Sequence, residues 1–355
     1  MRLSGMVLAM MLVGCGGSDD DTAASADADT DTDTDTDTDT DTDTDTDTDT
    51  DTDTDTDTDT ETSDPIDVET DYDFAAGILP GCDDLYEIAY QTWTLNDRPA
   101  EATFVFVNGR TEYTDKYHHL LPLLGEPYNV VMYDHFGQGR SGGLRAHADD
   151  FDAQHVCDFG TVLDTLTDSQ LPLFVAGHST GGMVVTRYMQ LHPGVIDAAV
   201  SSSPLMRPIT DPYGYDVARA LVVAQIELGL WEEPFAESST RPPCEDNIVT
   251  HDCELYDQFV DDEMTLIGSP TWGFVYNTFV VTEAMLAAAT DVVDPFLVFL
   301  AGDEHVVDNE GAEDFCAVQG CEMVVFEDDY HELFNELDRQ DVVDRMIEHF
   351  QASLP

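Results

Sequence analysis

The chain has 355 residues, which is enough for one large domain or two ordinary ones with a sizeable buried core. Its formal net charge is −63, with 75 Asp and Glu residues against 12 Lys and Arg residues. A negative field of this size repels nucleic acid and anionic lipid headgroups, so we expect no nucleic-acid partner. Such acidity suits either a surface kept soluble in salt, which we favour, or one that steers a cationic or zwitterionic substrate.

Residues 1–14 have the pattern of a signal peptide for export. They contain one basic residue, Arg2, and an apolar run at residues 6–13 that is too short to span a bilayer as a helix. The run ends in Leu12-Val13-Gly14-Cys15, which resembles the bacterial lipobox, in which a cysteine is lipidated and becomes the mature N-terminus. We therefore expect a protein anchored through Cys15 to a membrane of the bacterial cell envelope, outside the cytoplasm. The alternative is an ordinary secretory peptide with an incidental cysteine.

Residues 15–72 are predicted to be a lipidated N-terminus followed by a disordered linker. An unbroken Asp-Thr repeat fills residues 29–60, with no apolar face to bury and a negative charge at every second position. A chain that repels itself in this way stays extended, so it can hold a domain away from the membrane. From residue 73 onward there are still 50 Asp and Glu residues against 11 Lys and Arg residues. The acidity therefore belongs to the predicted folded domain, residues 73–355, as well.

In this domain, short apolar runs alternate with longer helical patterns, which is typical of a mostly parallel sheet with helices on both faces. The runs are rich in Val, Leu and Phe, as expected for strands buried on both faces. The predicted strands are residues 88–95, 102–107, 129–133, 171–176, 197–201, 295–300 and 322–326. The predicted helices between them are residues 115–124, 152–167, 181–191 and 338–351. The pattern predicts an α/β fold.

The interval between residues 204 and 291 is too long for a single crossover between two strands. It contains helical patterns at residues 216–228, 257–266 and 271–289. We interpret this interval as a helical cap, at about residues 205–290, that is inserted after the strand ending near Ser201. A cap of this kind would shape an acyl-binding pocket and exclude water from it.

Six cysteines remain when Cys15 is set aside, an even number that suits an oxidising compartment. None has the spacing of a zinc site, and we expect neither a metal nor another cofactor. Proximity in the sequence, a weak guide among fifteen connectivities, favours the following pairs: Cys244 with Cys253, Cys316 with Cys321, and hence Cys82 with Cys157.

The strongest chemical motif is Gly177-His178-Ser179-Thr180-Gly181, which lies between a predicted strand and a predicted helix. This is the Gly-x-Ser-x-Gly pattern of a nucleophilic serine on a strained turn, where flanking side chains larger than glycine would collide. The N-terminus of the following helix would direct backbone N–H groups at a developing oxyanion. We predict Ser179 to be a nucleophile, and the alternative is an ordinary strand-to-helix turn.

A serine nucleophile needs a histidine base, and the histidine needs a carboxylate. In hydrolases whose serine lies on a Gly-x-Ser-x-Gly turn between a strand and a helix, the chain order is serine, acid, histidine. His331 follows the last predicted strand and precedes the final helix, so it is the predicted base. The other candidates lie at different places: His178 is next to Ser179, His305 precedes the last predicted strand, and His349 is within the final predicted helix. The acid should follow the preceding strand, where the candidates are Asp303, Glu304 and Asp308.

A second oxyanion donor is expected in the loop at Asn108-Gly109-Arg110, after the predicted strand 102–107. One oxyanion donor is expected from the backbone of this loop and the other from the backbone directly after the nucleophile. We therefore predict the backbone N–H groups of Arg110 and Thr180 as the donors. The alternative for Arg110 is a surface loop arginine.

Residues 94–350 resemble the group of α/β-hydrolases that contains monoacylglycerol lipases and bacterial lysophospholipases, with the closer similarity to the lysophospholipases. The matching pieces, besides the turn at Ser179, are Asn108-Gly109-Arg110, residues 134–141, residues 192–195, residues 268–272, residues 304–309 and Tyr330-His331-Glu332. The resemblance implies an α/β-hydrolase fold and selects Glu304 as the acid. Two departures are Asn108, in place of the usual histidine, and Glu304, in place of the commoner aspartate.

The expected reaction is acyl transfer to water, in which Ser179 attacks an ester carbonyl and an acyl-enzyme is then hydrolysed. The resemblance implies a lysophospholipid or a monoacylglycerol as the lipid ester substrate. A general carboxylesterase or an acyltransferase is the alternative among enzymes. A catalytically silent surface-binding lipoprotein is the alternative from another class.

Overall fold

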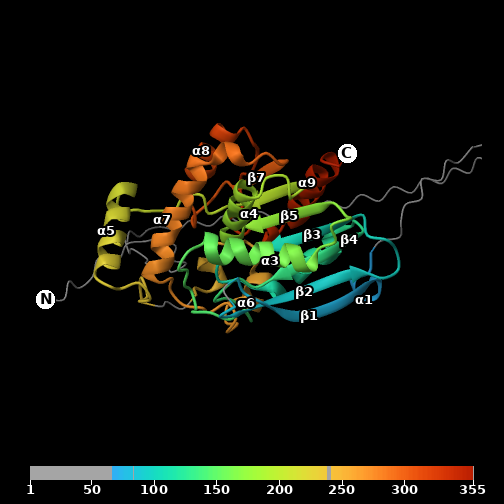
Figure 1. Ribbon diagram of the computed structural model, residues 1–355, viewed down its shortest axis with the longest axis horizontal. Helices are drawn as coiled ribbons and strands as arrows, with labels where there is room; N and C mark the ends of the chain where they lie inside the picture. The colour runs from blue at the N-terminus through green and yellow to red at the C-terminus, as the bar shows by residue number, and fades with distance from the viewer. Residues whose placement is uncertain (1–65, 83, 238–240, 355) are drawn as a thin grey trace, which may run out of the picture. The chain divides into compact units, whose positions relative to one another are not determined.

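The computed structural model describes residues 66–82, 84–237 and 241–354 (Figure 1). The predicted signal peptide, the predicted lipidation site at Cys15 and the Asp-Thr repeat lie outside these ranges. Within them, no helix combines the length and the apolar character that a membrane span requires.

The described residues form an eight-stranded sheet with the order β1-β2-β4-β3-β5-β6-β7-β8. The strands are β1 (Tyr72–Pro80), β2 (Glu87–Leu95), β3 (Ala102–Val107), β4 (Tyr128–Tyr133), β5 (Leu173–His178), β6 (Ala198–Ser202), β7 (Phe296–Ala301) and β8 (Glu322–Phe326). The pairs β1–β2 and β2–β4 are antiparallel, and all other pairs are parallel. With helices on both faces, this is the α/β-hydrolase fold, so the predicted fold class is confirmed.

Some helices cover the two faces of the sheet, and others form part of the segment between β6 and β7. They are α1 (Val68–Asp71), η1 (Thr114–Leu120), α2 (Leu121–Leu124), η2 (Asp152–Val156), α3 (Cys157–Leu166), α4 (Thr180–Leu191), α5 (Tyr215–Glu227), η3 (Cys244–Asp246), α6 (Cys253–Phe259), α7 (Trp272–Ala287), η4 (Ala289–Asp291), α8 (Glu310–Gln319), η5 (Leu333–Asn335) and α9 (Arg339–Ala352). Helices α3, α4 and α8 pack in one core, while η1, α2 and α9 pack in the other. Alternate residues of β7 enter opposite cores, with Val298 in the first and Phe299 in the second, as the period of two in a strand requires.

Several elements differ from the sequence-based predictions. Strand β1 was not predicted because most of its side chains are exposed at the edge of the sheet, so it has no continuous apolar run. Helix α8 was also missed. The predicted helix at 115–124 is a 3-10 helix followed by one turn of α-helix, and that at 152–167 begins with a π-helical turn before α3. The predicted strand 171–176 lies two residues later, because Gly177 and His178 continue the sheet pairing up to the serine.

The segment between β6 and β7 contains α5, α6 and α7. Helix α5 packs against α7 through a small apolar cluster that includes Val222 and Phe279. The helical pattern at 257–266 is displaced: α6 begins at Cys253, because the Asp252 side chain accepts a hydrogen bond from the Leu255 N–H and caps the helix.

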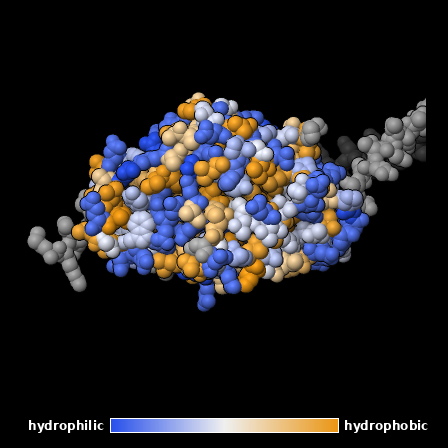
Figure 2. Space-filling view, in the orientation of Figure 1, coloured by the Kyte–Doolittle hydropathy of each residue, from blue (hydrophilic) through white to orange (hydrophobic). Residues whose placement is uncertain are grey.

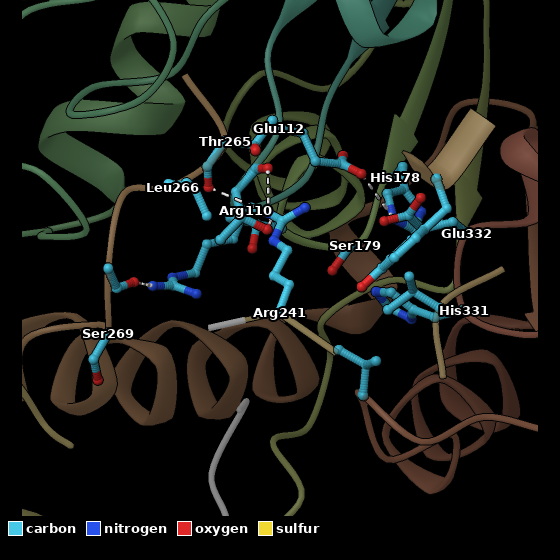
Figure 3. Close-up of a pocket in the computed structure, with 16 residues that line it drawn as sticks. Arg110, Glu112, His178, Ser179, Arg241, Thr265, Leu266, Ser269, His331 and Glu332 are labelled. Atoms are coloured by element: carbon cyan, nitrogen blue, oxygen red, sulfur yellow. Dashed lines mark hydrogen bonds and ion pairs between the residues drawn. The ribbon is translucent and has the colours of Figure 1, made fainter. Parts of the chain in front are cut away.

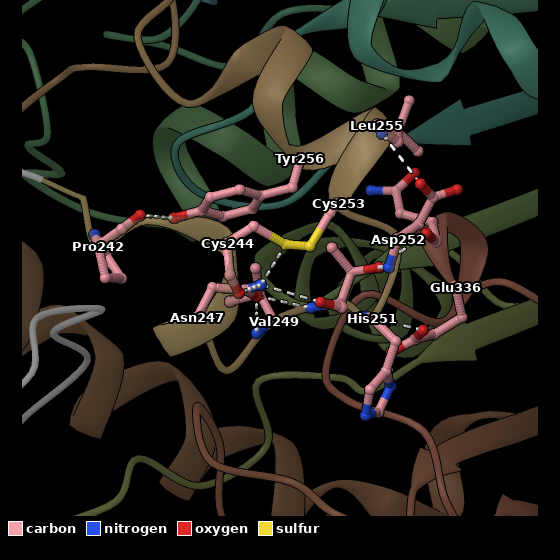
Figure 4. The surroundings of a disulfide bond; sticks show 12 residues. Pro242, Cys244, Asn247, Val249, His251, Asp252, Cys253, Leu255, Tyr256 and Glu336 are labelled. Carbon is pink, nitrogen blue, oxygen red and sulfur yellow. Dashed lines mark hydrogen bonds and ion pairs between the residues drawn. A yellow bond between two sulfur atoms is a disulfide. The ribbon is translucent and has the colours of Figure 1, made fainter.

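The structure contains the three disulfides that sequence proximity favoured, Cys82–Cys157, Cys244–Cys253 and Cys316–Cys321. The second of them joins η3 to α6 in the segment between β6 and β7 (Figure 4). The first ties the chain between β1 and β2 to the start of α3.

The visible face of the molecule carries hydrophilic side chains interspersed with smaller apolar areas (Figure 2). Exposed apolar side chains include Val217, Leu221 and Leu228 at α5 and its end. Isolated exposed apolar residues of this kind are common on globular proteins.

Candidate active site

Ser179 lies at the turn between β5 and α4. Its backbone angles are φ 53° and ψ −115°, a conformation that a serine rarely adopts. A Cβ atom at Gly177 would lie 2.6 Å from the carbonyl oxygen of Gly181, and one at Gly181 would lie 2.0 Å from that of Val107. The prediction of a strained turn that requires small flanking residues is therefore confirmed.

His331 and Glu304 form a hydrogen-bonded pair, with His331 Nδ1 2.8 Å from Glu304 Oε2. Glu304 follows β7 and His331 follows β8, so the parallel pairing of these strands brings their loops to the same edge of the sheet. The other oxygen of Glu304, Oε1, accepts hydrogen bonds from the backbone N–H groups of Val306 and Val307, at 2.7 and 3.2 Å. Both side chains of the pair are almost completely buried.

The other two carboxylates that the sequence offered as acids have different partners. Asp303 Oδ1 lies 2.9 Å from His305 Nε2, in an exposed pair. Asp308 Oδ2 lies 3.1 Å from Arg207 Nε. Among the three candidates, the structure places Glu304 against His331, in agreement with the choice that the family resemblance implied.

Two other histidines that the sequence analysis compared with His331, His178 and His349, form no hydrogen bond with Glu304 in the described part of the chain. His178 is buried beside the His331 ring, with 4.7 Å between the ring centroids, and burial lowers the pKa of His178 to about 4. It is therefore neutral at pH 7 and forms part of the wall behind His331. His349 lies in α9.

The electrostatics of the His331–Glu304 pair suit a proton acceptor. Burial alone would raise the pKa of Glu304, but the His331 ring outweighs burial and keeps the pKa of Glu304 below its ordinary value. Burial alone would lower the pKa of His331, but the Glu304 charge outweighs burial and raises the pKa of His331 above 6.5. The carboxylate thus stabilises the imidazolium that forms when His331 takes a proton.

Ser179 and His331 line the same pocket (Figure 3). No hydrogen bond joins Ser179 Oγ to His331 among the interactions of the described residues, which is common before substrate binds. The full lining is Arg110, Thr111, Glu112, His178, Ser179, Thr180, Arg241, Val249, Tyr256, Thr265, Leu266, Gly268, Ser269, Val306, His331 and Glu332.

The loop after β3 runs close beside Ser179. A Cβ atom at Gly109 would lie 3.2 Å from Ser179 Cβ, so glycine permits this approach. The predicted oxyanion donors, the N–H groups of Arg110 and Thr180, belong to residues that line the pocket, and neither N–H donates a hydrogen bond within the described part of the chain. Thr180 is the first residue of α4, where amides have no partner inside the helix. The two amides are thus available to a bound oxyanion.

Asn108, which departs from the resembled group, is buried next to this loop. Its carbonyl oxygen lies 2.8 Å from His135 Nε2. Burial lowers the pKa of His135 to about 4, so the ring is neutral and donates its Nε2–H to that carbonyl. The backbone of the loop is therefore supported without a histidine at position 108.

Known proteins share sequence similarity with most of this domain. Residues 98–338 match the model of the family described as serine aminopeptidase, S33. The chain belongs to this family of α/β-hydrolases. It is 30% identical to lysophospholipase L2 of Escherichia coli (strain K12) over 267 residues, which cover 66% of this chain and 75% of that protein. It is 28% identical to a monoacylglycerol lipase of Mycolicibacterium smegmatis over 265 residues, which cover 72% of this chain and 90% of that protein.

Solved structures of this fold include a monoacylglycerol lipase of Paleococcus ferrophilus, with a TM-score of 0.61 and 20% identity over 74% of this chain and 99% of that one. A soluble variant of the monoglyceride lipase of Saccharomyces cerevisiae has a TM-score of 0.61 and 19% identity, and the match covers 82% of this chain and 99% of that one. At this level of identity the two structures show that the fold is shared.

A buried ionic network contributes two acidic side chains, Glu112 and Glu332, to the lining of the pocket. Lys116 Nζ lies 2.8 Å from Glu112 Oε1 and 2.6 Å from Glu332 Oε1. The other Glu112 oxygen accepts a hydrogen bond from the Gly109 N–H. The network therefore joins the loop of the predicted oxyanion donors to the residue that follows His331.

The network places one cation, Lys116, between two carboxylates, Glu112 and Glu332. Burial alone would raise the pKa of Glu112, but the Lys116 charge outweighs it and lowers the pKa of Glu112 to about 2. Burial would lower the pKa of Lys116, but Glu112 and Glu332 raise it above its ordinary value. Lys116 is thus a protonated, buried cation between two acidic side chains.

The sequence analysis did not assign roles to Glu112, Lys116, Glu332 or Arg241. One usable signal was present, because Lys116 is the only lysine from residue 73 onward. The described residues contain no group of three or more His, Cys, Asp or Glu side chains that could hold a metal ion.

Proposed function

We propose that this protein is a serine ester hydrolase that releases the fatty acid from single-chain lipid esters, either lysophospholipids or monoacylglycerols. The observation that carries the proposal is the His331–Glu304 pair, joined at 2.8 Å, at the pocket that also holds Ser179 on its strained turn. The substrate class is supported by two curated relatives, one named lysophospholipase L2 and the other monoacylglycerol lipase.

The first half of the reaction forms an acyl-enzyme. Ser179 Oγ attacks the ester carbonyl while His331 Nε2 takes the hydroxyl proton, and Glu304 stabilises the imidazolium. The carbonyl electron pair moves onto the oxygen, where the N–H groups of Arg110 and Thr180 stabilise it. The intermediate then collapses: the bond to the alcohol breaks, and the alcohol leaves with the proton from His331.

The second half repeats these steps with water. Water attacks the acyl carbonyl and gives a proton to His331. The bond to Ser179 then breaks, and Ser179 Oγ recovers the proton from His331. The products are the fatty acid and a regenerated hydrolase.

The lining of the pocket suits an amphiphile. Apolar side chains, which would contact an acyl chain, come from the cap and from the loop after β7, namely Val249, Tyr256, Leu266 and Val306. Polar and charged side chains line other parts of the same pocket, among them Arg110, Arg241 and Ser269. A single acyl chain with a polar head matches this mixture.

The test is the release of fatty acid by the full chain from lysophospholipids, monoacylglycerols and short p-nitrophenyl esters. Ser179→Ala is compared with Ser169→Ala, which changes an exposed serine of the loop before β5. We expect activity on the single-chain lipids that is lost in Ser179→Ala and kept in Ser169→Ala. A fluorophosphonate probe should label Ser179 in the unchanged protein and in Ser169→Ala.

Other outcomes assign the protein to the alternatives. Turnover of short esters alone would indicate a general carboxylesterase. Formation of a new acyl ester when an alcohol is added would indicate an acyltransferase. A folded protein whose Ser179 does not react with the probe would be a surface-binding lipoprotein without catalysis.

We further propose that Cys15 is lipidated and holds the hydrolase at a membrane of the cell envelope. The support is the sequence pattern of residues 1–15, which ends in Gly14-Cys15. The acidic linker would then separate the domain from the membrane surface.

A further inference from the structure

The few cations of this acidic domain are mostly paired with carboxylates. Of the 11 Lys and Arg residues from residue 73 onward, eight lie within 4.0 Å of a carboxylate oxygen of another described residue. The described part of the chain gives no such partner to Arg110, Arg145 or Arg241. Two of these three, Arg110 and Arg241, line the pocket that contains Ser179 (Figure 3).

We propose that Arg110 and Arg241 form an anion subsite that binds the phosphate group in the head group of a lysophospholipid whose ester lies at Ser179. The proposal deepens the proposed function and rests on it for the identity of the lipid. It distinguishes between the two substrate classes left open above, because a monoacylglycerol has no phosphate.

The two guanidinium groups have hydrogen-bond donors to spare. Arg110 donates from Nη2 to the carbonyl oxygen of Gly268, and Arg241 donates from Nη2 to those of Thr111 and Thr265, at 3.2 Å each. Arg110 Nε is buried and has no partner among the described residues. A guanidinium carries five N–H donors, so each arginine retains several for a ligand.

The charges of the pocket favour an anion beside the two arginines. Burial and the charge of Arg241 lower the pKa of Arg110 to about 10, so Arg110 is still protonated at pH 7. The mutual repulsion of two like charges is relieved when an anion binds between them. The two carboxylates that line the pocket, Glu112 and Glu332, are paired with Lys116 and not with either arginine among the described residues.

Both arginines are held by their surroundings before any ligand binds. Arg241 directly precedes a braced segment, in which Pro242 accepts a hydrogen bond from the Tyr256 hydroxyl at 2.9 Å and the Cys244–Cys253 disulfide closes a short loop (Figure 4). Arg110 follows the end of β3, and its guanidinium lies 5.7 Å from the centroid of the Phe274 ring. Preorganised donors lose less conformational entropy on binding.

The chemistry of the two groups matches that of a phosphate. Arginine presents a planar fork of donors that binds phosphate oxygens in pairs, and such charge-assisted bonds are the strong ones. In a lysophospholipid the phosphate is attached to the same glycerol as the ester, so it lies a few bonds from the carbonyl that Ser179 attacks. The corresponding part of a monoacylglycerol is a neutral hydroxyl, which gains less from two cations.

The experiment compares kcat/KM of the full chain for a lysophosphatidylcholine and for a monoacylglycerol with the same acyl chain. Both substrates are presented at the same mole fraction in micelles of a neutral detergent. We expect Arg241→Gln to lower the ratio of lysophospholipid to monoacylglycerol activity by about tenfold to a hundredfold, as for the loss of one charge-assisted contact. Arg241→Lys, which keeps the charge but not the fork, should lower the ratio less.

The matched control is Arg145→Gln. Arg145 also has no carboxylate partner in the described chain, but it is exposed, donates to the carbonyl oxygens of Gly137 and Gly139, and does not line this pocket. Arg145→Gln removes the same charge from the domain as Arg241→Gln, but the ratio of lysophospholipid to monoacylglycerol activity should stay as in the unchanged protein. An equal fall of both activities in Arg241→Gln, or the same change of ratio in Arg145→Gln, would overturn the proposal.

A second measurement separates this proposal from the proposed function. Inorganic phosphate, at constant ionic strength, should competitively inhibit hydrolysis of a short neutral p-nitrophenyl ester, and Arg241→Gln should weaken this inhibition about tenfold or more. If single-chain lipids are not hydrolysed, the proposed function fails while this inhibition still reports on the subsite. Inhibition by free phosphate without preference for the lysophospholipid would overturn the head group as the ligand, and absence of inhibition would overturn the subsite.

Discussion

Glu304 Oε2 lies 2.8 Å from His331 Nδ1, so a glutamate occupies the place of the aspartate that is commoner in the resembled group. Its longer side chain is held because Oε1 accepts the backbone N–H groups of Val306 and Val307. These bonds fold the loop around the carboxylate, and the second oxygen is left to face His331. The substitution therefore keeps the contact that a proton-accepting histidine requires.

The first prediction concerns pH. His331 must be neutral to accept the Ser179 proton, and Glu304 raises its pKa above 6.5, so kcat/KM should rise with pH through an inflection above 6.5. In Glu304→Gln the charge is gone, so the inflection should move to lower pH and kcat should fall by about three to four orders of magnitude. Glu304→Asp, the charge-conserving control, should fall less. An inflection that stays in place in Glu304→Gln would show that another group titrates.

A second prediction concerns the buried cation. Lys116→Met would leave Glu112 and Glu332 without the lysine that joins them, and an uncompensated buried charge costs about 3–5 kcal/mol. The free energy of unfolding in urea at pH 7 should fall by about this amount. Arg345→Met, which breaks an exposed pair with Glu322, should cost about 1 kcal/mol or less. Equal losses in the two variants would contradict the idea that burial makes Lys116 important.

A third prediction follows from Asp329, whose pKa is raised from 3.8 to about 7 by burial and by the charges of Asp338 and Glu336. Between these pH values the folded chain holds a proton at Asp329 that the unfolded chain has lost. The contribution of Asp329 to the free energy of unfolding should therefore fall as the pH rises from 3.8 to about 7, and Asp329→Asn should lack this contribution, so the difference between the two proteins should change with pH over this range.

The control for this prediction is Asp328→Asn, at the exposed neighbouring position. Urea unfolding at a series of pH values measures both variants against the unchanged chain. A constant difference between Asp329→Asn and the unchanged chain across this range would show that Asp329 titrates alike in both states.

A fourth prediction compares two disulfides of different loop length. Cys82–Cys157 closes a sequence separation of 75 residues and Cys316–Cys321 one of 5. If loop closure in the unfolded chain sets their effect, the double serine variants should lose about 4 and about 2 kcal/mol of unfolding free energy, respectively. A larger loss at Cys316–Cys321 would show that local packing, which buries Cys316, matters more than chain entropy.

A fifth prediction concerns the anchor. If Cys15 is lipidated, full-length protein made in a bacterial host should incorporate labelled fatty acid and sediment with membranes. Cys15→Ser should lose both the label and the sedimentation, whereas Ser18→Ala, three residues away, should keep them. Membrane association of an unlabelled Cys15→Ser protein would mean that another part of the chain holds it there.

Local sequence patterns predicted much of the sheet. Apolar runs predicted β3 and β8 at their observed bounds. β3 is buried along its whole length and is therefore largely apolar, whereas β8 keeps an apolar sequence although much of it is exposed. The exposed edge strand β1 was missed for the converse reason, since an edge strand with solvent on its side chains needs no such run. The start of α6 depended on one capping side chain, Asp252, which the helical pattern does not include.

The candidate site likewise combines residues that the sequence predicted with contacts that only the folded structure shows. Residues 177–181 alone were enough to predict Ser179 as the nucleophile, because a strained strand-to-helix turn needs glycine on both sides of the serine. The sequence by itself determined His331 by chain order, but from the residues alone it left three carboxylates as partners. The tertiary structure assigned Glu304 to His331, because a hydrogen bond depends on where two separate loops meet. It also brought Lys116 between two acidic residues 220 positions apart and placed Arg241 in the pocket, since charge pairing depends on distance in space.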